Sequence, residues 1–410
     1  MSHLHNKKVL FWCLFIITLP FPLTSIAEGI IDIKPYIGSS IQYDDNIFRF
    51  STSSQAKAAI GSTTTSDVVK RVEFGADVNL RLSRQLISLS SSLSQSKFNR
   101  FTDLDNNGKS NSLRWDWRLG NQFYGELSAS KIEAIAGFSE TRSTLKNLRT
   151  TDRKFASFNW DFKPDWTIYA SRAQIKLDNA AENSQALNRE DKMTEAGVRF
   201  QSQLNTQLAL AYRVVDSTFP NRSGPIALFF GDASSQKEAI VTAAWLPGAK
   251  TRISTRLSYV NLERNITTGR DFSGFSQRLS LDYQATDKVN LNLAAYQIVA
   301  PVDDVVSTYV KSKGVDISPT WNMTSKVSLS GNLSYAQSTY LGSAILGNSG
   351  FAINTDERVD TSKLAGLSMI YAPTQKLITQ LQYQGERRTS NLEGQSYDFN
   401  SINFLVRYNF

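Results

Sequence analysis

The sequence repeats one unit about eight times: an alternating apolar and polar run, a short turn, a second such run, and a long polar loop. The short turns fall about forty residues apart, near positions 83, 121, 164, 205, 248, 287, 323 and 374. Antiparallel hairpins give this spacing when each strand has about ten to fourteen residues and short and long connections alternate. The pattern is typical of an up-and-down β-barrel that crosses the outer membrane of a bacterium.

The alternation has a period of two residues, which is the period of a strand with two unlike faces. Between positions 113 and 119, leucine and tryptophan alternate with the charged residues Arg114, Asp116 and Arg118. Two tryptophans on one exposed face are a liability in water but are favourable near lipid headgroups. A soluble β-propeller, the alternative with a similar period, has four short strands in each repeat, whereas each repeat here has two long ones.

The number of strands follows from the turns. Eight short turns account for sixteen strands, and end runs at Ile33–Tyr43 and Tyr397–Phe410 bring the expected total to about eighteen. We therefore expect an all-β, antiparallel transmembrane barrel. An even number of strands predicts that both termini lie in the periplasm and that the long loops lie outside the cell.

The N-terminal segment, residues 1–27, is predicted to be a secretory signal peptide. Lys7 and Lys8 precede the apolar run Val9–Leu23, and small residues at Ser25 and Ala27 form a cleavage site. An anchoring helix is the alternative, but the run is short and contains two prolines. Residues 28–410 then form a single barrel domain, and no later segment has eighteen consecutive apolar residues.

Removal of the signal peptide would remove Cys13, His3 and His5, the only cysteine and both histidines. The remaining chain could form no disulfide and no metal site built on Cys or His, and it lacks the usual general base for serine chemistry. We therefore expect no metal, no cofactor and no enzymatic activity. The net charge of +8 is spread along the chain without a dense basic cluster, so nucleic-acid binding is not expected.

The segment from Asp103 to Arg114 begins like a calcium-binding loop. The twelfth position of such a loop needs a bidentate glutamate, but here it is Arg114, whose charge would repel calcium. We interpret the segment as an ordinary polar hairpin loop.

A set of strand arginines and aspartates is expected to face the lumen, because a charge on the lipid face near the membrane centre costs about 2–4 kcal/mol. They could set the selectivity of a pore, or they could only pair with one another along the wall. Tyr296 shares a polar face with Asn290 and Asn292, where it could stack on a sugar ring or simply fill space. The candidate lumen residues are Asp77, Arg114, Asp116, Arg118, Arg213, Arg252, Arg256, Arg278, Asp282, Tyr296 and Arg407.

The exit of the first strand carries a distinctive pattern in Tyr43, Asp44, Asp45, Asn46 and Phe48. A Tyr-Asp-x-Asn-x-Phe stretch at this place resembles the EpsL-like β-barrel porins that are associated with exopolysaccharide operons. The resemblance implies a role in moving a polysaccharide across the outer membrane, with periplasmic export proteins as partners. From the residues alone, the two aspartates either form a turn through backbone contacts or bind a cation or sugar hydroxyls.

The chain ends on an aromatic strand that contains Tyr408 and Phe410. Such an ending resembles the signal that the outer-membrane insertion machinery reads, although it could be one more lipid-facing residue. The partners expected are therefore this machinery and the lipid bilayer. The resemblance implies a conduit for exopolysaccharide, and the lack of a phosphate-binding loop predicts that the conduit is passive. A general diffusion porin for small solutes is the alternative, and an outer-membrane enzyme is disfavoured by the missing histidine.

Overall fold

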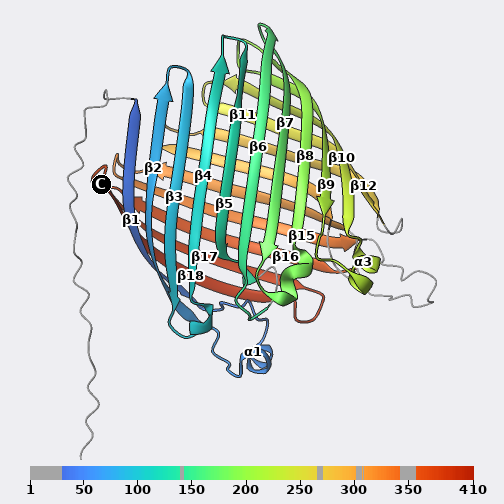
Figure 1. Cartoon of the computed structure of the whole chain (residues 1–410). Helices are drawn as coiled ribbons and strands as arrows, with labels where there is room; N and C mark the ends of the chain where they lie inside the picture. Colours follow the sequence, from blue (N-terminus) through green and yellow to red (C-terminus); the bar gives the residue numbers. More distant parts are fainter. Residues whose placement is uncertain (1–29, 139–142, 266–270, 302–306, 308, 342–356) are drawn as a thin grey trace, which may run out of the picture.

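The computed structural model describes residues 30–138, 143–265, 271–301, 307, 309–341 and 357–410. The predicted signal peptide lies outside these residues. The described chain forms one antiparallel sheet of eighteen strands, in which sequence neighbours pair and β1 also pairs with β18. The sheet therefore closes on itself as a barrel, which confirms the predicted fold class (Figure 1).

The strands have twelve to sixteen residues each. Their bounds are β1 (Ile31–Asp44), β2 (Asp67–Leu82), β3 (Gln85–Phe98), β4 (Asn106–Leu119), β5 (Phe123–Ile135), β6 (Leu148–Lys163), β7 (Trp166–Asn179), β8 (Arg189–Gln201), β9 (Gln207–Thr218), β10 (Ala233–Gly248), β11 (Thr251–Arg264), β12 (Phe272–Gln284), β13 (Val289–Pro301), β14 (Tyr309–Asn322), β15 (Val327–Leu341), β16 (Val359–Tyr371), β17 (Leu377–Ser390) and β18 (Tyr397–Asn409).

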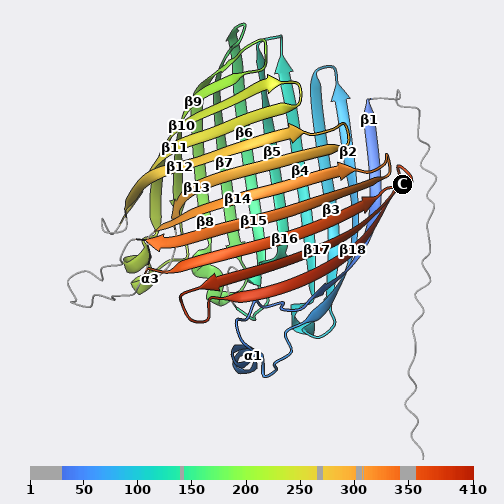
Figure 2. The ribbon, with the colours of Figure 1, turned by 180° about the vertical axis from the view of Figure 1, so that it is seen from behind.

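All eight short turns connect strands at the predicted positions, and the long connections alternate with them. Short helices lie only in long connections of the described chain: α1 (Ser53–Ile60), η1 (Thr102–Leu104), η2 (Glu182–Leu187) and α3 (Gly224–Phe230). No described helix is both long enough and apolar enough to cross a membrane. From behind, β11–β18 slope strongly across the wall relative to β2–β8, as the tilt of a closed barrel requires (Figure 2).

Aromatic side chains gather on the outer face close to the short turns. Tryptophan and tyrosine are favoured at this level because their rings are apolar while their polar atoms can reach water. A ring of such residues marks one boundary of a lipid-facing band. The exposed members are Trp160, Trp166, Trp245, Tyr283, Trp321, Tyr371 and Tyr408.

Two tyrosines on the opposite face lie over glycines of the neighbouring strand. Tyr36 on β1 is paired with Gly75 on β2, and Tyr296 on β13 is paired with Gly314 on β14. A Cβ atom added to either glycine would overlap the tyrosine ring. The missing side chain therefore makes room for each ring against the barrel wall.

We expect the substitution Gly75→Ala to destabilise the barrel by about 1–3 kcal/mol, because the added methyl group must displace the Tyr36 ring. Unfolding in guanidinium would measure the loss. Gly38→Ala is the matched control, because a Cβ at Gly38 meets its nearest atom at 3.8 Å. Equal effects of the two substitutions would show that the ring does not constrain this position.

Candidate functional site

The charged residues that were expected to face the lumen lie on one continuous face of the sheet. The strand register places Arg118 opposite Tyr124, Arg256 opposite Arg278, and Arg278 opposite Tyr296. Side chains on this face also reach across several strands. Arg199 on β8 donates to the Tyr124 hydroxyl on β5 at 2.9 Å. Such reach is favoured on the concave side of a curved sheet, where side chains converge, so we call this the inner face.

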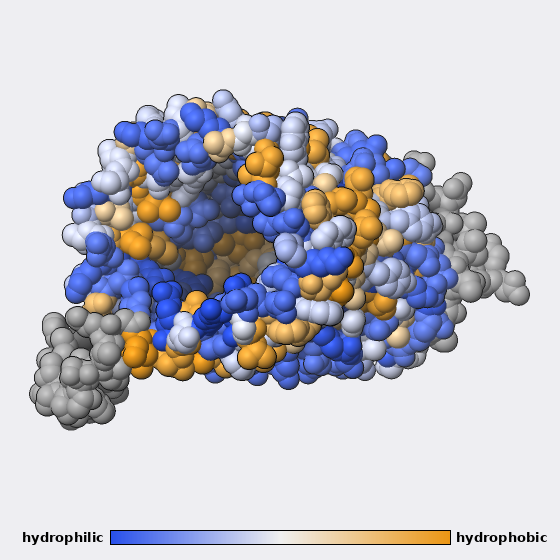
Figure 3. Space-filling view, turned by 90° about the horizontal axis from the view of Figure 1, so that it is seen from above, coloured by the Kyte–Doolittle hydropathy of each residue, from blue (hydrophilic) through white to orange (hydrophobic). Residues whose placement is uncertain are grey.

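The surface of the molecule is hollowed when viewed from above, and one side of the hollow is hydrophilic while hydrophobic residues also line it (Figure 3). This hollow agrees with an inner face that carries the polar residues of each strand. The exposed leucine, phenylalanine and tryptophan side chains alternate with them on the outer face.

Several candidate residues pair with neighbours on the inner face. Arg114 lies 2.7 Å from Asp116 and 3.3 Å from Glu126, in an exposed group. Arg407 pairs with Asp77 at 3.1 Å and lies 3.6 Å from the centre of the Tyr36 ring. These contacts reduce the net charge along β2–β5 and near the closure of the barrel.

The remaining candidates on β9–β13 also have neighbours. Arg213 forms ion pairs with Glu195 and Glu238, and Arg256 reaches Glu238 at 3.1 Å. Arg278 lies 3.4 Å from Asp316, and Asp282 accepts a hydrogen bond from Asn292. Arg118 lies 5.1 Å from the centre of the Tyr124 ring.

A pocket of about 260 Å³ lies over β8–β12, and arginine is the only charged residue type among its described lining residues. Arg199, Arg252, Arg256 and Arg278 border it. The floor consists of small residues such as Ala209, Ala244, Ser254 and Ser280. The register explains the shape, because one row of directly paired residues runs Arg199, Ala209, Thr242, Arg256 and Arg278. Long arginine side chains thus flank a hollow left by short ones.

Two arginines of this pocket form no ion pair with a described residue, although Asp282 is paired directly with Arg252 on the neighbouring strand. Within the described chain, Arg199 contacts the Tyr124 hydroxyl and the face of Tyr169 but forms no ion pair. Arg252 forms neither an ion pair nor a hydrogen bond with any described residue. The pocket therefore presents net positive charge to the space inside the barrel.

Arg199 was absent from the residues singled out in the sequence. The signal was present, because Arg199 lies between the apolar residues Val198 and Phe200 near a short turn. Arg252 lies beside the next short turn, which joins β10 and β11.

Tyr296 lies 5.4 Å from the Arg278 guanidinium, measured to the ring centre, and its ring covers Gly314. This contact accounts for the aromatic residue by packing alone. Stacking of Tyr296 on a sugar stays a prediction.

The residues after the first strand tie the first loop to β18. Asp44 is buried, accepts the backbone N–H of Asn46 at 2.9 Å and binds Arg49 through both carboxylate oxygens. Asp45 accepts the backbone N–H of Asn400 at 2.8 Å and its side-chain amide at 3.0 Å. These contacts favour the structural interpretation of the two aspartates.

The other members of this pattern also contribute to packing. Asn46 donates to the carbonyl oxygens of Phe50 and Asp398. Phe48 packs edge-on against Phe101 and Phe138, with ring centres 4.8 and 4.9 Å away. Tyr43 lies on the outer face and is 46% exposed.

The segment that begins like a calcium loop is divided between the long connection that contains η1 and the strand β4. β4 already begins at Asn106, so most of the segment expected to be a hairpin loop is strand. The Asp105 carboxylate accepts hydrogen bonds from the Lys97 ammonium at 2.8 Å and from the Phe98 backbone N–H at 2.7 Å. These bonds lower the pKa of the Asp105 carboxyl group.

The last strand ends at the short-turn side of the barrel. The Phe410 backbone N–H donates to the Pro35 carbonyl oxygen at 2.9 Å, and the Phe410 side chain is 64% exposed. The rings of Tyr408 and Phe410 meet edge to face with their centres 5.3 Å apart. A role of Tyr408 and Phe410 as an insertion signal stays a prediction.

We expect deletion of Phe410 to lower the amount of heat-modifiable barrel in outer-membrane fractions, because the insertion machinery would lose its signal. Phe410→Tyr is the control that keeps an aromatic end. Insertion of the deletion variant at the wild-type level would contradict a signalling role for this residue.

The sequence matches no known protein family and no curated protein, but its fold matches solved structures. A BenF-like porin from Pseudomonas fluorescens Pf-5 aligns with a TM-score of 0.52 over 92% of this chain and 98% of that one, at 9% identity. The outer membrane protein opdK from Pseudomonas aeruginosa aligns with a TM-score of 0.50 over 93% and 100%, at 11% identity. OpdQ from Pseudomonas aeruginosa gives 0.50 over 93% and 97%, at 9% identity. The chain has the fold of outer-membrane porins.

Proposed function

We propose that the protein is a passive outer-membrane channel that admits small solutes and favours anions. This is the diffusion-porin alternative, made more specific by the pocket on the inner face. The observation that carries it is the pocket over β8–β12, where four arginines and no described carboxylate form the charged lining. In this proposal the long loops lie outside the cell and both termini lie in the periplasm.

The physical basis is the charge of the wall that surrounds the space inside the barrel. Charged side chains in a pore raise the local concentration of ions of the opposite sign. Arginine keeps its charge at any relevant pH and can donate two parallel hydrogen bonds to a carboxylate or phosphate. Small carboxylates and phosphates are therefore the solutes that this pocket would favour.

Export of exopolysaccharide is the other hypothesis from the sequence. None of the comparisons supports it or the resemblance to EpsL-like proteins, and the residues that carry the resemblance make structural contacts. Deleting the gene would separate the two functions. The channel proposal expects normal surface polysaccharide and slower uptake of small anions, whereas loss of polysaccharide with unchanged uptake would favour export.

The channel proposal can be tested with purified protein in planar bilayers. A gradient of potassium chloride across the bilayer gives a reversal potential whose sign reports whether chloride or potassium crosses more easily. We expect steady conductance and the sign that corresponds to chloride. A sealed bilayer, or a preference for potassium, would overturn the proposal.

A further inference from the structure

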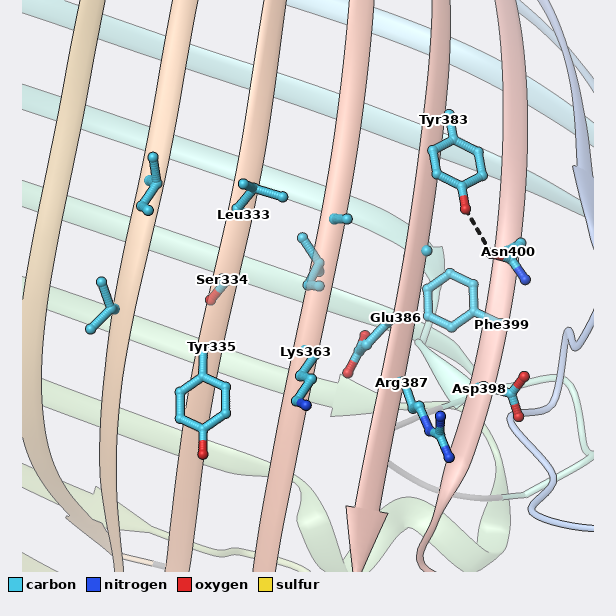
Figure 4. Close-up of a pocket in the computed structure, with 15 residues that line it drawn as sticks. Leu333, Ser334, Tyr335, Lys363, Tyr383, Glu386, Arg387, Asp398, Phe399 and Asn400 are labelled. Carbon is cyan, nitrogen blue, oxygen red and sulfur yellow. Dashed lines mark hydrogen bonds between the residues drawn. The ribbon is translucent and has the colours of Figure 1, made fainter.

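A groove of about 600 Å³ lies on the outer face of the barrel over β14–β18. Its lining includes Val315, Leu333 and Ala365, which belong to the apolar face of their strands. Ala365 and Gly385 are paired directly, and these two small residues leave a depression in the wall. Taller side chains, Tyr335 and Tyr383, stand on either side of it (Figure 4).

Two cations border the end of the groove that lies nearer the long loops. Lys363 on β16 and Arg387 on β17 are paired directly, so they lie on neighbouring strands at one level (Figure 4). Both are exposed, and neither forms an ion pair with a described residue. Asp398 is paired with Arg387 in the same row and offsets part of the charge, so the row keeps a net positive charge.

The level of these cations is that of a wider belt of charges on the outer face. Lysines at the long-loop ends of many strands occupy the same face as the apolar residues nearer the short turns. A lysine can lie along apolar surface while its ammonium group reaches the headgroup layer. The belt includes Lys70 and Lys97, which are paired directly on β2 and β3. Its other members are Lys109, Lys131, Lys154, Lys192 and Lys237.

We propose that this groove binds an acylated glycolipid with phosphate on its headgroup, the lipid type of the outer leaflet. An acyl chain would lie on the apolar floor beside Ala365, and a phosphate would contact Lys363 and Arg387. The apolar floor suits the acyl chain of such a lipid. The two cations suit its phosphate, because they lack partners among the described residues. The choice of this lipid rests on the proposed orientation, in which the long loops mark the outer leaflet.

The test compares diphosphoryl lipid A, dephosphorylated lipid A and phosphatidylglycerol, each added to the purified full-length barrel in detergent. Native mass spectrometry and thermal unfolding would report bound lipid. We expect diphosphoryl lipid A to bind and to raise the unfolding temperature more than the other two do. Lys363→Gln with Arg387→Gln should weaken its binding about 30-fold, since each cation near a charged surface contributes about fivefold.

The matched control is Lys109→Gln with Lys131→Gln, which removes the same charge from the outer face at a distance from the groove. We expect this variant to bind lipid A within about twofold of the wild type. Ala365→Trp fills the groove without a change in charge and should also abolish binding, and its conductance in bilayers verifies that the barrel is folded.

Three outcomes would overturn the proposal. The first is equal weakening by the groove and control variants, which would indicate general charge attraction. The second is equal binding of phosphatidylglycerol and diphosphoryl lipid A, which would show that the groove does not recognise the glycolipid. The third is unchanged binding by Ala365→Trp. Because ion selectivity is measured separately, failure here would leave the proposed channel function unaffected.

Discussion

Replacement of Arg199 and Arg252 by glutamine is expected to reverse or abolish the preference of the channel for anions. These are the two arginines of the inner pocket that form no ion pair with a described residue, although Asp282 is paired directly with Arg252. A unit charge at about 4 Å in water changes the energy of an ion by about 1 kcal/mol, or about fivefold in its local concentration. We expect the permeability ratio of chloride to potassium to fall by at least about fivefold at 0.1 M salt.

Salt concentration provides an internal check on this prediction. The Debye length falls from about 10 Å at 0.1 M salt to about 3 Å at 1 M, so the difference between wild type and variant should shrink at the higher concentration. Lys109→Gln with Lys131→Gln is the control, because it removes the same charge from the outer face. A control variant that changes the reversal potential as much as the pocket variant would rule out the pocket as the source of selectivity.

The fold could be predicted from the sequence because the barrel has two chemically different faces. A period of two residues, such as that around Arg114 and Trp115, fixes which side chains share a face, and turn residues fix where strands end. The turn positions and the number of strands follow directly. The short helices α1 and α3 were not predicted, because they depend on packing within the long connections.

The pocket could not be predicted, because it depends on the register between strands. Arg199 and Arg278 are far apart in the sequence and come into one row only through four successive pairings. The short side chains of Ala209 and Thr242 leave the hollow between the arginines of this row. Nothing in the sequence of either strand alone indicates that these two small residues are aligned. A shift of one register position would have dispersed the row.

The outer groove shows a second limit of the sequence argument. The cost of a charge on the lipid face led us to expect a set of strand arginines inside the barrel, but Arg387, which was not in that set, lies on the outer face. The cost depends on depth and falls to about 0–1 kcal/mol near the interfaces. Arg387 is only three residues from the end of β17, where the long connection begins, so a cation there is tolerated.

A buried ion-pair cluster joins β15, β16 and β17 at their long-loop ends. Asp360 is 3% exposed and lies 2.8 Å from Arg358, and it also pairs with Arg388. The Arg358 guanidinium lies 4.1 Å from the centre of the Tyr340 ring. Arg388 also donates to the Tyr340 hydroxyl at 3.4 Å. One carboxylate thus holds two guanidinium groups close together.

We expect Asp360→Asn to destabilise the barrel by about 3 kcal/mol, because it removes the charge of the buried carboxylate that the half-buried guanidinium groups of Arg358 and Arg388 both contact. Unfolding in guanidinium after reconstitution would measure the loss, and faster proteolysis of the connection between β17 and β18 would locate it. Asp116→Asn is the control, since the exposed pair with Arg114 contributes less than about 1 kcal/mol. Replacing Asp360 and Arg388 together by leucine should recover part of the loss, because it removes Arg388 along with the carboxylate that Arg388 contacts. If Asp360→Asn costs no more than Asp116→Asn, the cluster does not hold these three strands together.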